Sequence, residues 1–204
     1  MEQYVDPDVS RRKFEREVAD YRLHEREYRR RGWLLLRAEF PEVMVVFVAA
    51  NLKPPAIVTG ALLDYTNYDA APPSFLLVNP LTEEPYKASD LPTWLKRQVP
   101  GPAFPIEGLA LPPGAAIPRI VSEQPLMQWY DADDVPFLCV AGVREYHEHP
   151  AHSGDHWEQH RRAGAGRIAR LLEVVDTYGL RPITDYNLQL KIEVVGFAQG
   201  QTPE

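Results

Sequence analysis

Cysteine is the scarcest residue that bears on function, with a single copy, Cys139, among 204 residues. One cysteine cannot form an internal disulfide, so a disulfide-stapled scaffold is excluded. The sequence also has no run of about 20 apolar residues, the length that a membrane-spanning helix needs. Its first six residues lack the basic and apolar regions of a secretory signal. We therefore expect a cytoplasmic protein with no membrane partner.

A surplus of positive charge is also absent. The formal net charge is −7, and nucleic-acid binding depends on a basic surface that neutralises phosphates. We therefore expect no nucleic-acid partner. At 45% hydrophobic and 25% charged residues, the composition is that of a globular protein with a sizeable core. The length favours a single domain over residues 1–204.

Basic residues are nevertheless concentrated near the N-terminus. Residues 10–31 hold nine of them against five acids. Apolar residues recur there at helical spacing, with Ser10 as a plausible N-cap and Gly32 as a stop, which predicts one amphipathic helix over 10–31. A solvated helix face is one interpretation of the charge, and an acidic partner is the other. The arginines assigned to such a partner are Arg11, Arg12, Arg16, Arg22 and Arg26.

Short apolar segments rich in β-forming residues follow this helix. Residues 33–38 and 43–49 flank a predicted turn at Phe40-Pro41-Glu42, and residues 56–66 and 74–79 continue the pattern. A helix followed by a run of strands predicts an α+β fold with an antiparallel β-meander rather than a parallel sheet.

The second half of the chain is less regular. Residues 99–118 are dense in proline and glycine, and we interpret them as an ordered surface excursion, with an interdomain linker as the alternative. Residues 135–140 predict a short buried strand. A helix is expected from 155 to 178, with Asp155 as its cap. Strict alternation over residues 186–194 predicts a final, half-buried strand.

Chemistry is concentrated between Cys139 and His160, where five of the six histidines lie. Zinc takes thiolate, imidazole and carboxylate ligands in sets of four, and this segment contains all three types. If the segment were extended, side chains two residues apart, such as His147 and His149, would point to one side. The zinc interpretation uses Cys139, Glu145, His149 and His152.

Nucleophilic catalysis is the second chemistry that these residues allow. Cys139 would act as a thiolate that a histidine base activates. That base can be His147, His149 or His152. Glu145 would orient the ring of that base. The simpler interpretation is a buried cysteine that acts as a small hydrophobe beside an exposed polar loop.

The sequence resembles two known families. The run Tyr68-Asp-Ala-Ala-Pro72-Pro73-Ser74-Phe75, after a helix and strands, is similar to the Tyr-Pro-x-x-Pro-Pro segment of ubiquitin-conjugating enzymes. In that fold an active-site cysteine, a tryptophan and a further helix follow the meander, and here Cys139, Trp157 and residues 155–178 come in that order. This resemblance implies a UBC-like fold.

Cys139, Glu145 and the His147–His152 group resemble a predicted metal-binding family with a Cys-Glu-His-His signature. That family occurs in bacterial operons that encode ubiquitin-like proteins, an activating enzyme and a metalloprotease, and some of these operons defend against phage. The two resemblances together imply that Cys139 carries a ubiquitin-like modifier as a thioester and passes it to a target protein. The catalytic residues would be Cys139, Glu145, His147, His149 and His152.

The partners that these resemblances imply are the modifier, an activating enzyme docked on the basic helix, and the target. No cofactor is expected in this interpretation. Two alternatives are a zinc-binding protein without transfer chemistry and a non-enzymatic adaptor that keeps the conjugating-enzyme fold.

Overall fold

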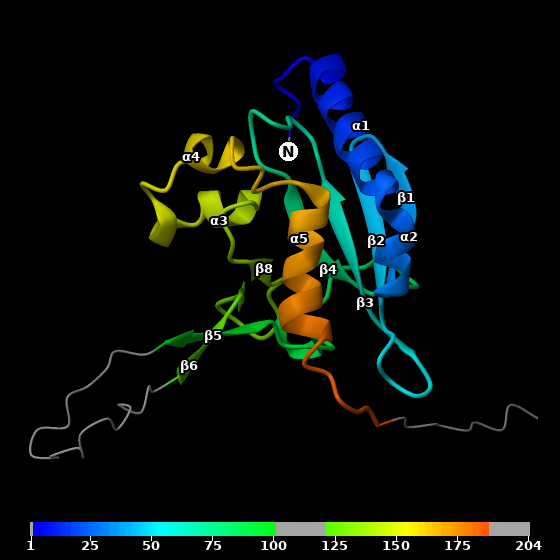
Figure 1. The fold of residues 1–204 in the computed structure, drawn as a ribbon. Coiled ribbons are helices and arrows are strands. Elements are labelled where there is room, and N and C mark those ends of the chain that lie inside the picture. The colour runs from blue at the N-terminus through cyan, green and yellow to red at the C-terminus, as the bar shows by residue number, and fades with distance from the viewer. Residues whose placement is uncertain (1, 101–120, 188–204) are drawn as a thin grey trace, which may run out of the picture.

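The structure is a computed structural model that describes residues 2–100 and 121–187 (Figure 1). It is an α+β fold: N-terminal helices, a four-stranded antiparallel sheet, two small two-stranded sheets, and short helices in the second half of the chain. The α+β class and the meander that the sequence predicts are confirmed. None of the helices in the described ranges is both long and apolar enough to span a membrane.

Two helices stand where the sequence predicts one helix over 10–31. They are α1 (Pro7–Leu23) and α2 (Glu25–Arg30). The cap of α1 is Asp6, whose side chain accepts a hydrogen bond from the Asp8 backbone N–H at 2.9 Å, whereas the expected cap, Ser10, is buried inside the helix. The helical path is interrupted at His24. Gly32 ends α2 as expected, with a positive φ of 89° that glycine adopts without strain.

The main sheet has the strand order β1-β2-β3-β4, with every neighbouring pair antiparallel. Its strands match the four predicted segments to within two residues and are β1 (Trp33–Glu39), β2 (Glu42–Ala49), β3 (Ala56–Asp64) and β4 (Ser74–Val78). The turn at Phe40-Pro41 connects β1 to β2, as expected.

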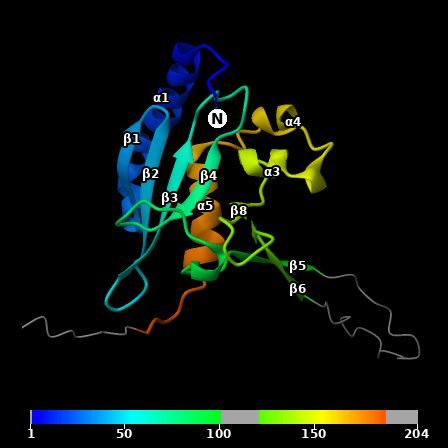
Figure 2. The ribbon, with the colours of Figure 1, turned by 180° about the vertical axis from the view of Figure 1, so that it is seen from behind.

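One face of this sheet lies against α1 and α5 (Ile168–Val175), and Figure 2 shows the opposite face from behind. The main core fills the space between the helices and the sheet, because alternate residues of each strand point toward it. The buried residues there include Phe14, Trp33, Phe47, Leu63, Phe75 and Leu172. The opposite face carries a smaller apolar cluster around Met44, Val46 and Val78.

Two small sheets follow the meander and a short 3₁₀ turn, η1 (Ala88–Asp90). The first pairs β5 (Lys96–Pro100) with β6 (Val121–Pro125), and the second pairs β7 (Met127–Gln128) with β8 (Phe137–Leu138). Most of the expected excursion at 99–118 lies outside the described residues, and its flanks pair as β5 and β6. The strand expected over 135–140 is reduced to β8.

The helix expected over 155–178 is wrong as a single element. The second half instead contains α3 (Arg144–Glu148), the turn η2 (Pro150–His152), α4 (Trp157–Arg161), α5 and a π-helical turn, η3 (Asp176–Leu180). Gly164, with φ of 69°, breaks the path between α4 and α5. The final strand expected over 186–194 lies almost wholly outside the described residues.

Candidate functional site

Cys139 follows β8 directly and is fixed by its own backbone. Its N–H donates to the Leu126 carbonyl at 2.7 Å, and the Leu126 N–H donates to the Leu95 carbonyl at 2.8 Å. These two bonds connect the cysteine to the segments that carry β7 and β5. The half-buried thiol therefore lies on a supported hairpin beside β4, which contacts β8.

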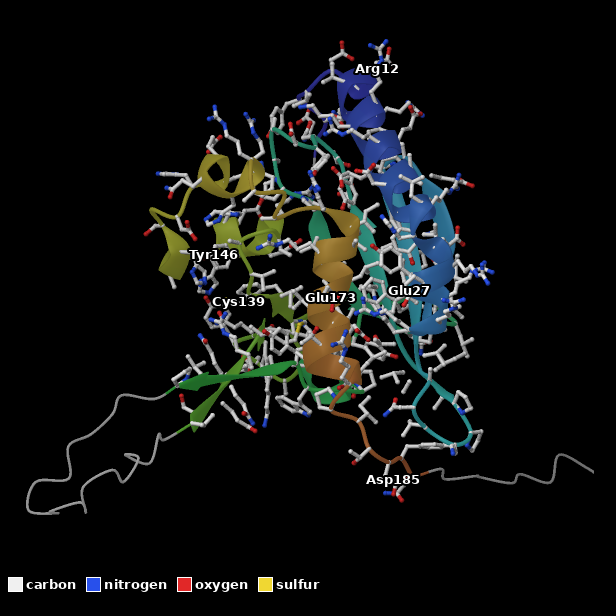
Figure 3. The ribbon with its side chains drawn as sticks, viewed as in Figure 1. Arg12, Glu27, Cys139, Tyr146, Glu173 and Asp185 are labelled. Atoms are coloured by element: carbon white, nitrogen blue, oxygen red, sulfur yellow. The ribbon has the colours of Figure 1, made fainter. Side chains whose placement is uncertain are left out.

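His152 is the histidine that reaches the thiol. Its Nε2 lies 3.3 Å from Cys139 Sγ, and η2 places it there. The Tyr146 ring stacks on the His152 ring with centroids 3.9 Å apart. Figure 3 shows Cys139 and Tyr146 on the same side of α5, away from Arg12. The structure thus selects one of the three histidines that the sequence left as possible bases.

The pKa shifts of this pair favour neutral forms of both groups. Burial raises the pKa of the Cys139 thiol above its ordinary value, and the positive charge of Arg97 offsets only part of this rise. Burial and then the neighbouring His149 lower the pKa of His152. At neutral pH the resting pair is therefore a thiol that can donate to an unprotonated imidazole nitrogen, so His152 is suited to act as a general base.

Asp155 organises the groups behind this pair. Its Oδ2 accepts from the Tyr146 hydroxyl at 2.6 Å, and its Oδ1 lies 2.5 Å from His160 Nε2. These bonds, from Tyr146 first and His160 second, lower the pKa of Asp155. Because Tyr146 is held by its hydroxyl, its ring stays against His152. The cap role that the sequence assigned to Asp155 is wrong, since α4 starts two residues later and has no side-chain cap bond.

His147 has a structural role in this arrangement. Its Nδ1 lies 2.8 Å from the Asp155 carbonyl oxygen and its Nε2 lies 2.8 Å from the Ala141 carbonyl oxygen. Because both ring nitrogens contact backbone acceptors, neither is free to take a proton from Cys139. The geometry does not support the catalytic role that the sequence assigned to His147.

His149 makes a different set of contacts from His147. Its Nδ1 accepts from the Ala151 N–H at 3.2 Å, and its Nε2 lies 2.5 Å from the Tyr130 hydroxyl. The sequence placed the two rings on one side only if the segment were extended, and residues 144–148 are helical, so that condition is not met. The His149 and His152 rings are neighbours, with their centroids 5.5 Å apart.

Glu145 points into the fold instead of toward the thiol. Its carboxylate accepts from the Ser74 hydroxyl and, at 3.4 Å, from the Phe75 N–H, so it fastens α3 to β4. Burial raises its pKa, and the Ser74 hydrogen bond counteracts part of that rise. The orienting role expected for Glu145 is therefore not supported, because no described contact joins it to a histidine.

The same geometry bears on the zinc interpretation. Cys139 and His152 adjoin, but Glu145 is directed to Ser74 and His149 to Tyr130. Within residues 2–100 and 121–187, no three His, Cys, Asp or Glu side chains are grouped as metal ligands would be. The zinc interpretation gains no support from this arrangement.

The N-terminal arginines lie apart from the cysteine. All five assigned to a partner are exposed, and Arg11 contacts the Phe40 ring with its guanidinium 5.0 Å from the centroid. None of the five forms an ion pair with another described residue. They remain accessible on α1 and α2, which is compatible with either interpretation of their charge.

The fold and this site define an α+β protein with a cysteine–histidine pair beside an antiparallel meander. A model of the Y4jH family, described as Y4jH-like, matches residues 5–183, and the chain belongs to this family. A relative from Sinorhizobium fredii (strain NBRC 101917 / NGR234), described as "uncharacterized protein y4jH", is 38% identical over 194 residues, covering 95% of this chain and 93% of its own. Neither description states an activity.

Proposed function

We propose that this protein is a ubiquitin-conjugating-enzyme-like transferase that carries a ubiquitin-like modifier as a thioester on Cys139. The observation that carries the proposal is the 3.3 Å approach of His152 Nε2 to Cys139 Sγ, in a half-buried position next to the sheet. A thiol paired with a neutral base, and reachable from solvent, is the arrangement that acyl transfer to sulfur requires.

The layout of the chain supports the same proposal. A helix, α1, precedes a four-stranded antiparallel meander, and Pro72-Pro73 stands directly before β4. The cysteine follows the meander, and Trp157 and the second-half helices follow the cysteine. That is the order of elements in the UBC-like fold, to which the sequence shows a resemblance.

In the loading step, Cys139 sulfur attacks the thioester carbonyl that joins the modifier to its activating enzyme. His152 Nε2 takes the thiol proton, a new C–S bond forms on Cys139, and the activating enzyme's sulfur leaves and recovers a proton. In the transfer step, an amine of the target attacks the Cys139 thioester, the C–S bond breaks, and the proton lost by the amine restores the thiol. His152 can relay both protons because it is the base in contact with sulfur.

The partners in this proposal are the modifier, the activating enzyme and the target protein. The exposed arginines of α1 and α2 form the surface assigned to the activating enzyme. The resemblance to the operon family extends the proposal to a bacterial modification system with a role in defence against phage.

The test combines the purified protein with ATP and with a ubiquitin-like protein and an activating enzyme from a bacterial operon of the type that the resemblance implies. We expect an adduct of one modifier on Cys139, removed by excess thiol and detected by intact-mass spectrometry. Cys139→Ser should give an adduct that resists thiol, and His152→Ala should load slowly. His156→Ala removes an exposed histidine of the same segment and should load normally. Conjugation that persists in Cys139→Ala would refute the proposal.

A further inference from the structure

An aromatic hollow of about 290 Å³ opens beside the cysteine–histidine pair. It is formed by the β6–β7 segment, the turn between β7 and β8, and His149, the residue before η2. Its lining residues are Pro125, Met127, Gln128, Trp129, Tyr130, Phe137 and His149. Most of its walls come from the hairpin that also carries Cys139.

The hollow lies near the reacting sulfur, one histidine ring removed from the cysteine–histidine pair. His149 forms one wall, its ring centroid lies 5.5 Å from that of His152, and His152 Nε2 lies 3.3 Å from Cys139 Sγ. Phe137, two residues before the cysteine, forms another wall. An extended peptide spans about 3.3–3.6 Å per residue, so a chain attached to Cys139 reaches the hollow within two or three residues.

The lining of the hollow selects apolar groups. Methionine, tryptophan, phenylalanine and tyrosine form most of it, and it contains no lysine, arginine, aspartate or glutamate. Both His149 nitrogens are already engaged, by Ala151 and Tyr130. Tyr130 is 79% exposed although its ring stacks on His149, so the hollow presents aromatic surface to solvent. Ligand sites in proteins are lined mostly by hydrophobic and aromatic side chains of this kind.

We propose that this hollow binds an aromatic or large aliphatic side chain of the acyl chain that Cys139 receives. That side chain belongs to the second or third residue of the chain, counting the residue that carries the acyl carbonyl as the first. The inference rests on the proposed function, because that function supplies the acyl chain. It adds a sequence preference for the tail of the modifier, set by Tyr130 and Trp129 rather than by the catalytic pair.

The test uses three acetylated tripeptide thioesters of 2-mercaptoethanesulfonate: Phe-Gly-Gly, Gly-Phe-Gly and Gly-Gly-Gly. Cys139 attacks the carbonyl, the thioester C–S bond breaks, and the released thiol recovers the proton. Acylation is followed by intact-mass spectrometry. We expect at least one phenylalanine peptide to react about tenfold faster than Gly-Gly-Gly, the size of effect that partial burial of one aromatic ring gives.

Tyr130 provides matched variants, since an exposed side chain can be removed without unfolding the chain. Tyr130→Ala should abolish the preference, measured as each phenylalanine peptide's rate relative to the same variant's Gly-Gly-Gly rate, whereas Tyr130→Phe should keep it. Acylation at equal rates for all three peptides in the native protein would overturn the inference and leave the thioester proposal standing.

A binding measurement distinguishes the two proposals without relying on acylation. The same peptides as unreactive amides are titrated while the Trp129 indole signal is followed by nuclear magnetic resonance. Selective binding of a phenylalanine amide, with no acylation by any thioester, would support the hollow and refute the carrier role of Cys139. No shift at Trp129 with either phenylalanine amide at millimolar concentration would overturn the inference directly.

Discussion

Arg144 offers the sharpest test of how the site is held to the sheet. It is the first residue of α3, its side chain is 8% exposed, and its guanidinium lies 3.1 Å from the Asp64 carboxylate. The same side chain donates to the carbonyls of Asp64 and Thr66 at 3.3 and 3.0 Å, and its backbone N–H donates to Pro73 at 2.9 Å. Arg144→Met keeps most of the side-chain volume and removes these side-chain bonds.

Removing one partner of a buried ion pair costs about 3–5 kcal/mol. Asp64 is 29% exposed and keeps its Thr66 hydrogen bonds, so the lower end of that range applies here. For a chain of this size, about 3 kcal/mol lowers the melting temperature by roughly 6–12 °C. Arg37→Met is the matched control, because its pairs with Glu42 and Glu83 are surface pairs, worth about 0–1 kcal/mol.

The assay is urea unfolding followed by circular dichroism, with equal m-values required before the free energies are compared. A loss in Arg144→Met no greater than in Arg37→Met would refute the reasoning. The pH adds a second check. Burial alone would raise the pKa of Asp64, but hydrogen bonds from Thr66 and Arg144 outweigh it and lower the pKa. A carboxyl group whose pKa is lowered by folding stabilises the folded state at pH values above its unfolded-state pKa. That contribution is lost as the pH falls through the folded-state pKa. The difference between native protein and Arg144→Met should therefore shrink in acid.

The strands of the meander could be predicted from sequence because each carries its own signal. Residues 43–49 are an almost continuous apolar run, and the structure places them as β2, an inner strand covered on both faces. The turn at Phe40-Pro41 needs only local information as well. The fold class follows from such local signals once their order along the chain is known.

The geometry of the candidate site could not be predicted in the same way, because it depends on contacts between distant residues. Glu145 lies among the histidines in sequence, yet it bonds to Ser74, 71 residues away. His152 was one of three equal candidates, and only the path of α3 and η2 brings it to Cys139. Tyr146 and Tyr130 were missed because a tyrosine carries no motif, although Tyr146 lies inside the candidate segment.

Three further predictions concern this segment. Gly142→Ala should destabilise the protein by at least about 1 kcal/mol in urea unfolding, because the added Cβ would overlap the Ala165 carbonyl. Glu145→Gln should unfold no more easily than the native protein at pH 7. Burial raises the pKa of Glu145, and a carboxyl group with a raised folded-state pKa stops stabilising the fold as the pH rises through that pKa. A clear loss in the free energy of unfolding at pH 7 would contradict this. The last prediction concerns the resting state of Cys139, measured by the rate of iodoacetamide alkylation from pH 5 to 10. Because burial raises the thiol pKa, the rate should climb through the alkaline range without an acid plateau. An ion pair of thiolate with protonated His152 would instead give rapid alkylation near pH 6 that His152→Ala removes. If that acid plateau is seen, His152 stabilises a thiolate that already exists, and its role as a general base in the loading step is wrong.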